Sequence, residues 1–75
     1  MDNQNSQSQE TLSRAKILLR EFSEAVVGKG ERSLTEILAE LDRLAVENRR
    51  ELPGDLRHYL ERRSYQKAAA FLGVE

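Results

Sequence analysis

Asp55, His58 and Glu61 stand three residues apart and are side chains that can share a proton or bind a metal. On a helix this spacing places an imidazole between two carboxylates on neighbouring turns. Acid–base or metal chemistry also needs further ligands and shelter from water. The chain has one histidine and no cysteine, so it is poor in such ligands. We therefore expect a solvated face, with no catalytic residue, no metal and no cofactor.

The glycine-containing stretch VVGKGERS, residues 26–33, is a second candidate site. A Walker-type phosphate loop has wider glycine spacing, ends in Gly-Lys-Ser/Thr and lies between a strand and a helix. This stretch follows a helical pattern and lacks that spacing, which favours a helix-ending turn. Ser6, Ser8 and Ser13 have no histidine nearby in sequence, so no catalytic triad can be argued from them. The chain is predicted not to be an enzyme.

Basic and aromatic residues are concentrated between residues 49 and 67. This segment has Arg49, Arg50, Arg57, Arg62, Arg63 and Lys67 against Glu51, Asp55 and Glu61, a balance of +3, whereas residues 1–48 have a balance of −3. Such a surface suits an acidic protein partner, or nucleic acid if phosphates meet the cations and bases stack on tyrosine. The pI of about 5.9 favours the protein partner, with nucleic acid as the alternative. The candidate partner-binding residues are Arg57, Tyr59, Arg62, Arg63, Tyr65 and Lys67.

Two amphipathic helices are predicted before this basic segment. Apolar residues recur at steps of three and four from Leu12 to Val26, which predicts a helix over about 9–27 that ends at Gly28 and Gly30. Ser33 and Glu36 form a capping box for a second helix, which Pro53 and Gly54 end. The short connection between them predicts an antiparallel hairpin.

The stretch LRHYLERRSYQKAAAFLG, residues 56–73, does not fit one straight amphipathic helix. On a single helical wheel, Arg63 and Lys67 fall within the apolar stripe. Either one kinked helix or two helices separated at Ser64 fits the pattern. In the second case Asp55 and Ser64 are N-caps, while Gly73 and Val74 form a Schellman ending.

The predicted fold is all-α, a small bundle of three helices. The third is either one kinked helix or two helices separated near Ser64. Residues 1–9 are polar after Met1 and are expected to be a disordered tail, and residues 10–75 to be one helical domain. The expected core is Leu18, Leu19, Phe22, Val26, Leu34, Ile37, Leu38, Leu41, Leu44, Leu56, Tyr59 and Leu60. No segment has the length and hydropathy of a membrane span or the pattern of a secretion signal, so we expect a cytoplasmic protein.

A chain of 75 residues without disulfides buries a small core and gains stability from a second copy. The apolar stripes are wider than a two-helix seam requires, which favours a homodimeric bundle. The candidate dimer core is Leu19, Phe22, Val26, Ile37, Leu41 and Leu44. In such a dimer, Arg57, Arg62 or Arg63 of one subunit can lie near Glu36, Glu40 or Glu47 of the other. The predicted function is a non-catalytic protein–protein interaction module, and a small nucleic-acid-binding or regulatory protein is the alternative.

Overall fold

The computed structural model describes residues 2–74, and the side chains of residues 9–74. The elements are α1 (Asp2–Val26), α2 (Leu34–Glu47), a 3-10 helix η1 (Arg49–Glu51), α3 (Gly54–Glu61) and α4 (Tyr65–Leu72). All regular structure in this part of the chain is helical, which confirms the all-α class. The third predicted helix is two separate helices. None of the helices in the described part has the length and apolar character needed to cross a bilayer.

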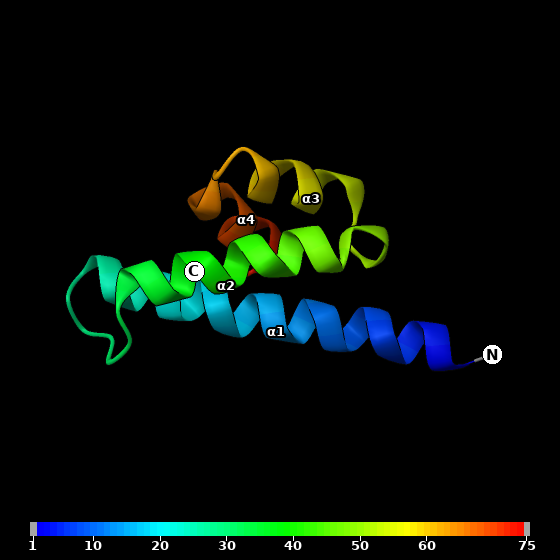
Figure 1. Cartoon of the computed structure of the whole chain (residues 1–75), viewed down its shortest axis with the longest axis horizontal. Helices are drawn as coiled ribbons and strands as arrows, with labels where there is room; N and C mark the ends of the chain where they lie inside the picture. Colours follow the sequence, from blue (N-terminus) through cyan, green and yellow to red (C-terminus); the bar gives the residue numbers. More distant parts are fainter. Residues whose placement is uncertain (1, 75) are drawn as a thin grey trace.

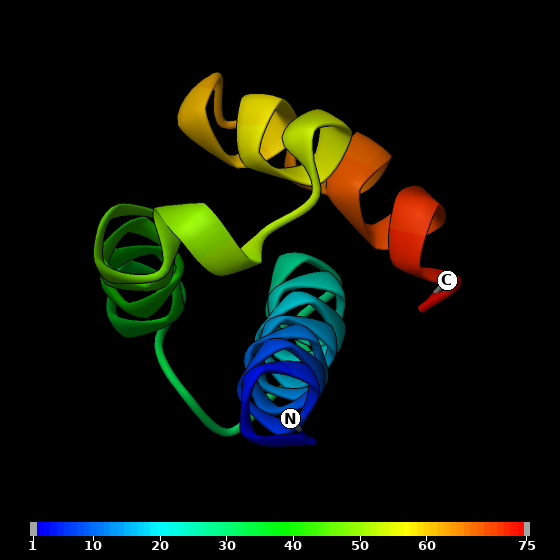
Figure 2. The ribbon, with the colours of Figure 1, turned by 90° about the vertical axis from the view of Figure 1, so that its right-hand side faces the viewer.

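The long helices α1 and α2 lie side by side and run in opposite directions, as the hairpin prediction requires (Figure 1). The short helices α3 and α4 lie together across one open side of that hairpin (Figures 1 and 2). Figure 2, which looks along the hairpin, shows three groups around a common centre: α1, α2 and the α3–α4 unit, residues 54–74. The core fills this centre.

The start of α1 differs from the prediction. The helix begins at Asp2, within the segment predicted to be a disordered tail, and not near residue 9. Helical backbone hydrogen bonds are made within the segment, so a polar turn can extend a helix without packing on a core. Met1 and the side chains of residues 2–8 lie outside the described residues, and tail disorder in solution stays a prediction.

Three helices end in the same hydrogen-bonded arrangement, the Schellman motif. Its two backbone bonds at the end of α4 join Gly73 N–H to Ala70 O (3.1 Å) and Val74 N–H to Ala69 O (2.9 Å). This confirms the predicted ending. The same pattern ends α1, with Gly28 in the left-handed position at φ +79°.

The break at Ser64 is the third Schellman motif. Arg63 N–H donates to Leu60 O (3.1 Å) and Ser64 N–H donates to Tyr59 O (2.7 Å). Arg63 occupies the left-handed position that glycine takes in the other two motifs, with φ +60°, and is the one described non-glycine residue with positive φ. The phase of the apolar pattern therefore resets at this point, and the break is confirmed over the kinked helix.

The helix starts are only partly as predicted. Ser33 caps α2, where its Oγ accepts a hydrogen bond from Glu36 N–H at 3.1 Å. Asp55 was predicted to cap α3, but the cap is Pro53, whose carbonyl accepts from Arg57 N–H at 2.9 Å. Proline has a φ that a residue before a helix can adopt, so the helix starts two residues earlier than predicted, at Gly54, and includes Asp55 in its first turn. Ser64 is at the N-cap position of α4, but its side chain makes no capping bond.

The core lies between α1, α2 and the α3–α4 unit. It contains Ala15, Leu18, Leu19, Ile37, Leu41, Leu44, Ala45, Leu52, Leu56, Leu60, Tyr65, Ala68 and Ala69. Phe22, Leu38 and Tyr59 from the predicted core are half-buried and pack against it. Val26 and Leu34 were also predicted in the core, but they are 54% and 38% exposed. They lie where the hairpin extends beyond the short helices, so nothing covers them.

Two groups of side-chain hydrogen bonds hold the connection after α1 and the 3-10 helix η1 against the long helices. Arg32 donates to Glu21 at 3.0 Å and also to Glu40, which joins the turn after α1 to both long helices. The hydrogen bond between Arg32 and Glu40 raises the pKa of the arginine and lowers the pKa of the glutamate. Thr11, buried in α1, donates its hydroxyl to Glu51 of η1 at 2.5 Å. These bonds fix both ends of α2 against α1.

Candidate interaction surfaces

Asp55, His58 and Glu61 are all exposed on α3. Within the described part of the chain, no group of three His, Cys, Asp or Glu side chains is arranged to hold a metal ion. The His58 ring lies 6.3 Å from the ring of Tyr59, its neighbour in sequence. The arrangement is a solvated helix face that provides no sheltered position for a substrate.

The backbone amides of the Gly28–Gly30 turn are used to end α1. The N–H groups of Gly28, Lys29 and Gly30 donate to carbonyls of Ala25 and Glu24 at 2.8–3.2 Å. A phosphate-binding loop requires such amides to point at the ligand. This turn has none of its three amides available, so it cannot bind phosphate in that way.

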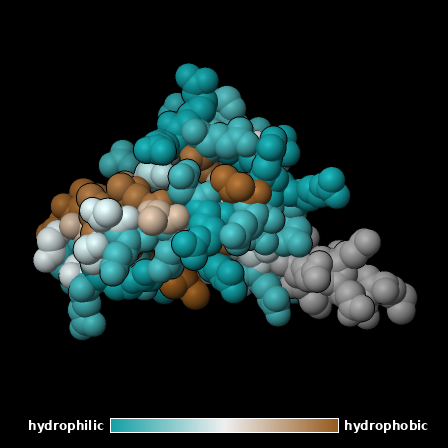
Figure 3. Space-filling model, viewed as in Figure 1, coloured by the Kyte–Doolittle hydropathy of each residue, from teal (hydrophilic) through white to brown (hydrophobic). Residues whose placement is uncertain are grey.

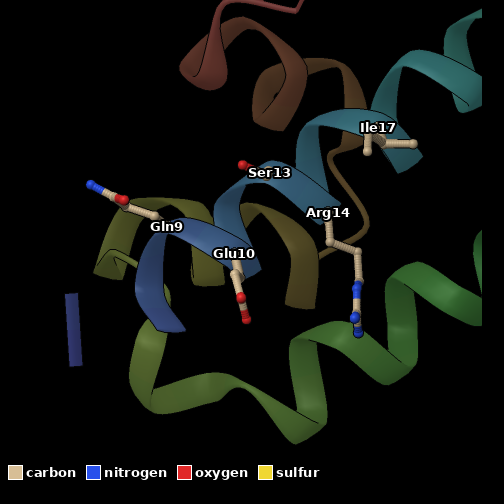
Figure 4. Close-up of a pocket in the computed structure, with 5 residues that line it drawn as sticks. All are labelled: Gln9, Glu10, Ser13, Arg14 and Ile17. Atoms are coloured by element: carbon tan, nitrogen blue, oxygen red, sulfur yellow. The ribbon is translucent and has the colours of Figure 1, made fainter. Parts of the chain in front are cut away.

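A shallow hollow lies along α1 and is lined by Gln9, Glu10, Ser13, Arg14 and Ile17. All five residues come from one helix, and their side chains point in different directions and do not meet at a common point (Figure 4). A small-molecule site needs a concave wall with convergent polar groups. This hollow has neither, and it is an exposed helix surface.

Apolar side chains that the fold leaves uncovered gather where α1 ends and α2 begins. We name this surface the apolar end: Phe22, Ala25, Val26, Val27, Leu34 and Leu38. Val26, Val27 and Leu34 are 54%, 65% and 38% exposed, and the other three are half-buried. Figure 3 shows hydrophobic residues gathered at this end of the hairpin, at the left of the view.

The lengths of the helices explain why the apolar end is open. At 1.5 Å per residue, the 14 residues of α2 extend about 21 Å, and the eight residues of α3 or α4 only about 12 Å. The α3–α4 unit therefore covers the middle of the hairpin and leaves one end of its apolar stripe in solvent. The sequence pattern of α1 and α2 alone cannot show which part of a stripe is covered.

The predicted dimer core has to be corrected for this reason. Leu19, Ile37, Leu41 and Leu44 are at most 3% exposed within the single chain, where α3 and α4 pack against the hairpin. They are not available to a second copy unless the fold opens. Val26 is exposed and Phe22 is half-buried, so these two of the six residues belong to an accessible surface.

The predicted partner-binding residues are mostly accessible, and one of their four cations is paired within the part of the chain that the structure describes. Arg62, Arg63 and Lys67 are exposed, and Arg57 is half-exposed. Arg63 lies 3.9 Å from Asp42 of α2, an exposed ion pair within the chain. Arg49 lies 3.8 Å from Glu61 in the same way.

Tyr65 is the predicted partner-binding residue that the structure rules out as a surface anchor. It is 8% exposed, and its ring centroid lies 5.2 Å from that of Phe22. Burial raises the pKa of its hydroxyl. Tyr59 is half-buried beside Phe71, with ring centroids 6.2 Å apart.

The outer face of α4 is absent from the predicted sites apart from Lys67. Gln66, Lys67, Ala70 and Phe71 are exposed there, opposite the buried Tyr65, Ala68 and Ala69. The signal is present in the sequence once the break at Ser64 is accepted, because a helical wheel restarted at Tyr65 places these four side chains together.

Comparison with known proteins gives no further guide to this surface: no family model, no curated protein and no solved structure matches the chain.

Proposed function

We propose that the protein is a non-catalytic protein–protein interaction module that forms a homodimer through its apolar end. The observation that supports this most is the apolar end itself, where three exposed and three half-buried apolar residues gather as α1 ends and α2 begins. Burial of exposed apolar side chains is the main favourable term in protein association. A small domain without disulfides gains most from such burial.

The charges beside the apolar end favour a second copy of the chain as its partner. A two-fold interface places the same patch on both sides, so the patch must be complementary to itself. The turn beside the apolar end has exposed charges of both signs at Lys29 and Glu31. In a two-fold contact, Lys29 of one subunit can meet Glu31 of the other, while the valines and leucines meet at the centre.

The area required shows how far such an interface extends. A typical specific interface covers about 800 Å² on each partner, roughly a seventh of the 5446 Å² surface of this chain. The apolar end supplies the centre of that area, and the first turn of α2 and the turn after α1 supply a polar rim. The cross-subunit pairs predicted from the sequence are weaker candidates, because Arg63 and Glu40 already have partners within the chain.

The test is the molar mass in solution, measured by light scattering during size exclusion at about 50 µM. We expect a dimer for the wild-type chain and a monomer for Val26→Glu and Leu34→Glu, because a charge at the centre of an interface is desolvated without a partner. Ile17→Glu and Val46→Glu are matched controls, since these residues are 55% and 67% exposed but lie outside the apolar end.

Circular dichroism of each variant shows that its helices are retained. A wild-type monomer at this concentration refutes the homodimer, and so does equal dissociation by the control variants. A dimer that only the apolar-end variants disrupt supports it. The cytoplasmic location expected from the sequence belongs to the same proposal and is tested by fractionation of expressing cells.

A further inference from the structure

The α3–α4 unit has the proportions of a helix-turn-helix. Two helices of eight residues each are joined by the three-residue turn Arg62–Ser64, whose middle residue has φ +60°. DNA-binding helix-turn-helix units use such a short turn, often with glycine, to set a second helix at an angle to the first. In Figure 2, α3 and α4 overlap beside the turn, and α4 extends beyond α3 towards the C-terminus.

The charges of the molecule are separated in the way that such a surface requires. Residues 49–74 have six cations and three anions, whereas residues 1–48 have six cations and nine anions. Two of the three anions are engaged, because Glu51 accepts from Thr11 and Glu61 lies 3.8 Å from Arg49. Arg50, Arg57, Arg62 and Lys67 have no carboxylate within 4.0 Å in the part of the chain that the structure describes.

The outer face of α4 combines side chains that contact base edges. Gln66, Lys67, Ala70 and Phe71 are exposed, and the sequence of the helix, YQKAAAFL, has no acidic residue. Glutamine can bond the N6 and N7 of adenine, alanine or phenylalanine can contact the methyl of thymine, and Lys67 beside them can reach a phosphate. The small side chain at Ala70 also lets the helix approach a groove floor.

We propose that the α3–α4 unit binds double-stranded DNA, with α4 in the major groove and with Arg57, Arg62 and Lys67 at the phosphates. The major groove of B-DNA admits an α-helix, whereas that of A-form RNA is too narrow for side chains to read. The acidic α1–α2 side opposes non-specific binding in other orientations and so directs the basic side towards DNA. This proposal does not depend on dimerisation, because one α3–α4 unit contains all the residues that it uses.

The first experiment measures binding of a fluorescein-labelled 20-base-pair duplex of mixed sequence by anisotropy at 50–200 mM salt. We expect binding at 50 mM salt that weakens steeply as salt is added. Charge reversal at Arg62 or Lys67 is expected to weaken binding about tenfold or more at 50 mM salt. Arg20→Glu is the matched control, since Arg20 is an exposed cation on α1 and its reversal is expected to change binding much less.

The neutral variant Lys67→Ala tests whether Lys67 contacts a phosphate, and the measured quantity is the salt dependence of binding. The slope of log affinity against log salt is expected to fall by about 0.9 in magnitude for each phosphate that the variant no longer neutralises. Gln66→Ala is expected to leave this slope unchanged and to alter the sequences selected from a random duplex pool, since it removes a side chain that bonds a base edge. Circular dichroism confirms that each variant remains helical.

Three results overturn the proposal: no duplex binding at 50 mM salt, tighter binding of single-stranded DNA or of RNA than of the duplex, or equal weakening by Arg20→Glu. The dimer has a separate readout in the molar mass of the apolar-end variants. A chain that is monomeric and binds duplex DNA supports this inference and refutes only the dimer.

Discussion

Replacement of Arg63 by glycine is expected to stabilise the protein, although it removes a charged side chain that makes an ion pair. Arg63 has φ +60° in the turn between α3 and α4. A left-handed conformation costs a residue with a Cβ roughly 1–2 kcal/mol, and glycine avoids this cost. Glycine loses more backbone entropy on folding, which offsets about 0.5–1 kcal/mol of the gain.

The ion pair that is lost takes little from this gain, because it is long and open to solvent. Arg63 and Asp42 are 3.9 Å apart, and their side chains are 72% and 57% exposed. Pairs this open to solvent contribute between zero and about 1 kcal/mol, with many at the lower end. We therefore expect Arg63→Gly to raise the free energy of unfolding by about 0.5–1 kcal/mol. For a domain of this size, that corresponds to a rise of roughly 2–8 °C in Tm.

Urea unfolding followed by circular dichroism at 222 nm measures the difference in free energy. Arg63→Ala removes the same charge and keeps the strain, so it is expected to give no such gain. Arg62→Gly places glycine at φ −90°, where it has no conformational advantage, and is expected to destabilise by about 0.5–1 kcal/mol. The reasoning is refuted if Arg63→Gly is no more stable than Arg63→Ala.

Three further predictions test the helix cap, the charged cluster and the core. Ser33→Ala removes the bond to Glu36 N–H and is expected to cost about 1 kcal/mol of stability, measured by urea unfolding. The pKa of Glu40 is lowered, first by its hydrogen bond from Arg32. The contribution of this bond to stability is therefore complete above the unfolded pKa and disappears as pH falls through the folded pKa. The difference in urea midpoint between wild type and Glu40→Gln should therefore be largest near neutral pH and shrink as the pH falls through the folded pKa of this carboxyl; a constant difference contradicts it. Leu41 is completely buried, so Leu41→Ala is expected to cost about 2–5 kcal/mol, visible as a lower Tm; a loss under about 1 kcal/mol would show that the core closes around the cavity.

Local features of this fold were predictable where a residue has a strong backbone preference. Gly73 has φ +72°, and the hydrogen bond from Val74 to Ala69 follows from that turn. Ser33 caps α2 because a short hydroxyl side chain can reach the amide of Glu36. Arg63 shows the limit of this reasoning, since an arginine gives no sequence signal for a left-handed turn. The break was therefore one of two open interpretations.

Features that depend on how helices meet were predicted less well. Tyr65 was a candidate for partner binding because it lies in the segment rich in basic and aromatic residues, but its position on α4 turns the ring towards Phe22 of α1. Val26 and Leu34 follow the apolar period of their helices and still lie in solvent. A helical period identifies the face of a helix, and the lengths and positions of other elements decide how much of that face is buried.

The strain at Arg63 connects stability with the proposed DNA surface. Glycine would fit this turn better, as it does at Gly28 and Gly73, so the arginine has a cost of roughly 0.5–1 kcal/mol without a strong contact to explain it. Strained residues often occur at functional sites, where the side chain has a use outside the fold. Next to Arg62 and at the start of α4, the Arg63 side chain can reach a phosphate beside the helix that enters the groove. If this is its use, Arg63→Gly makes the chain more stable and its binding of duplex DNA weaker, whereas a purely structural arginine would change stability alone.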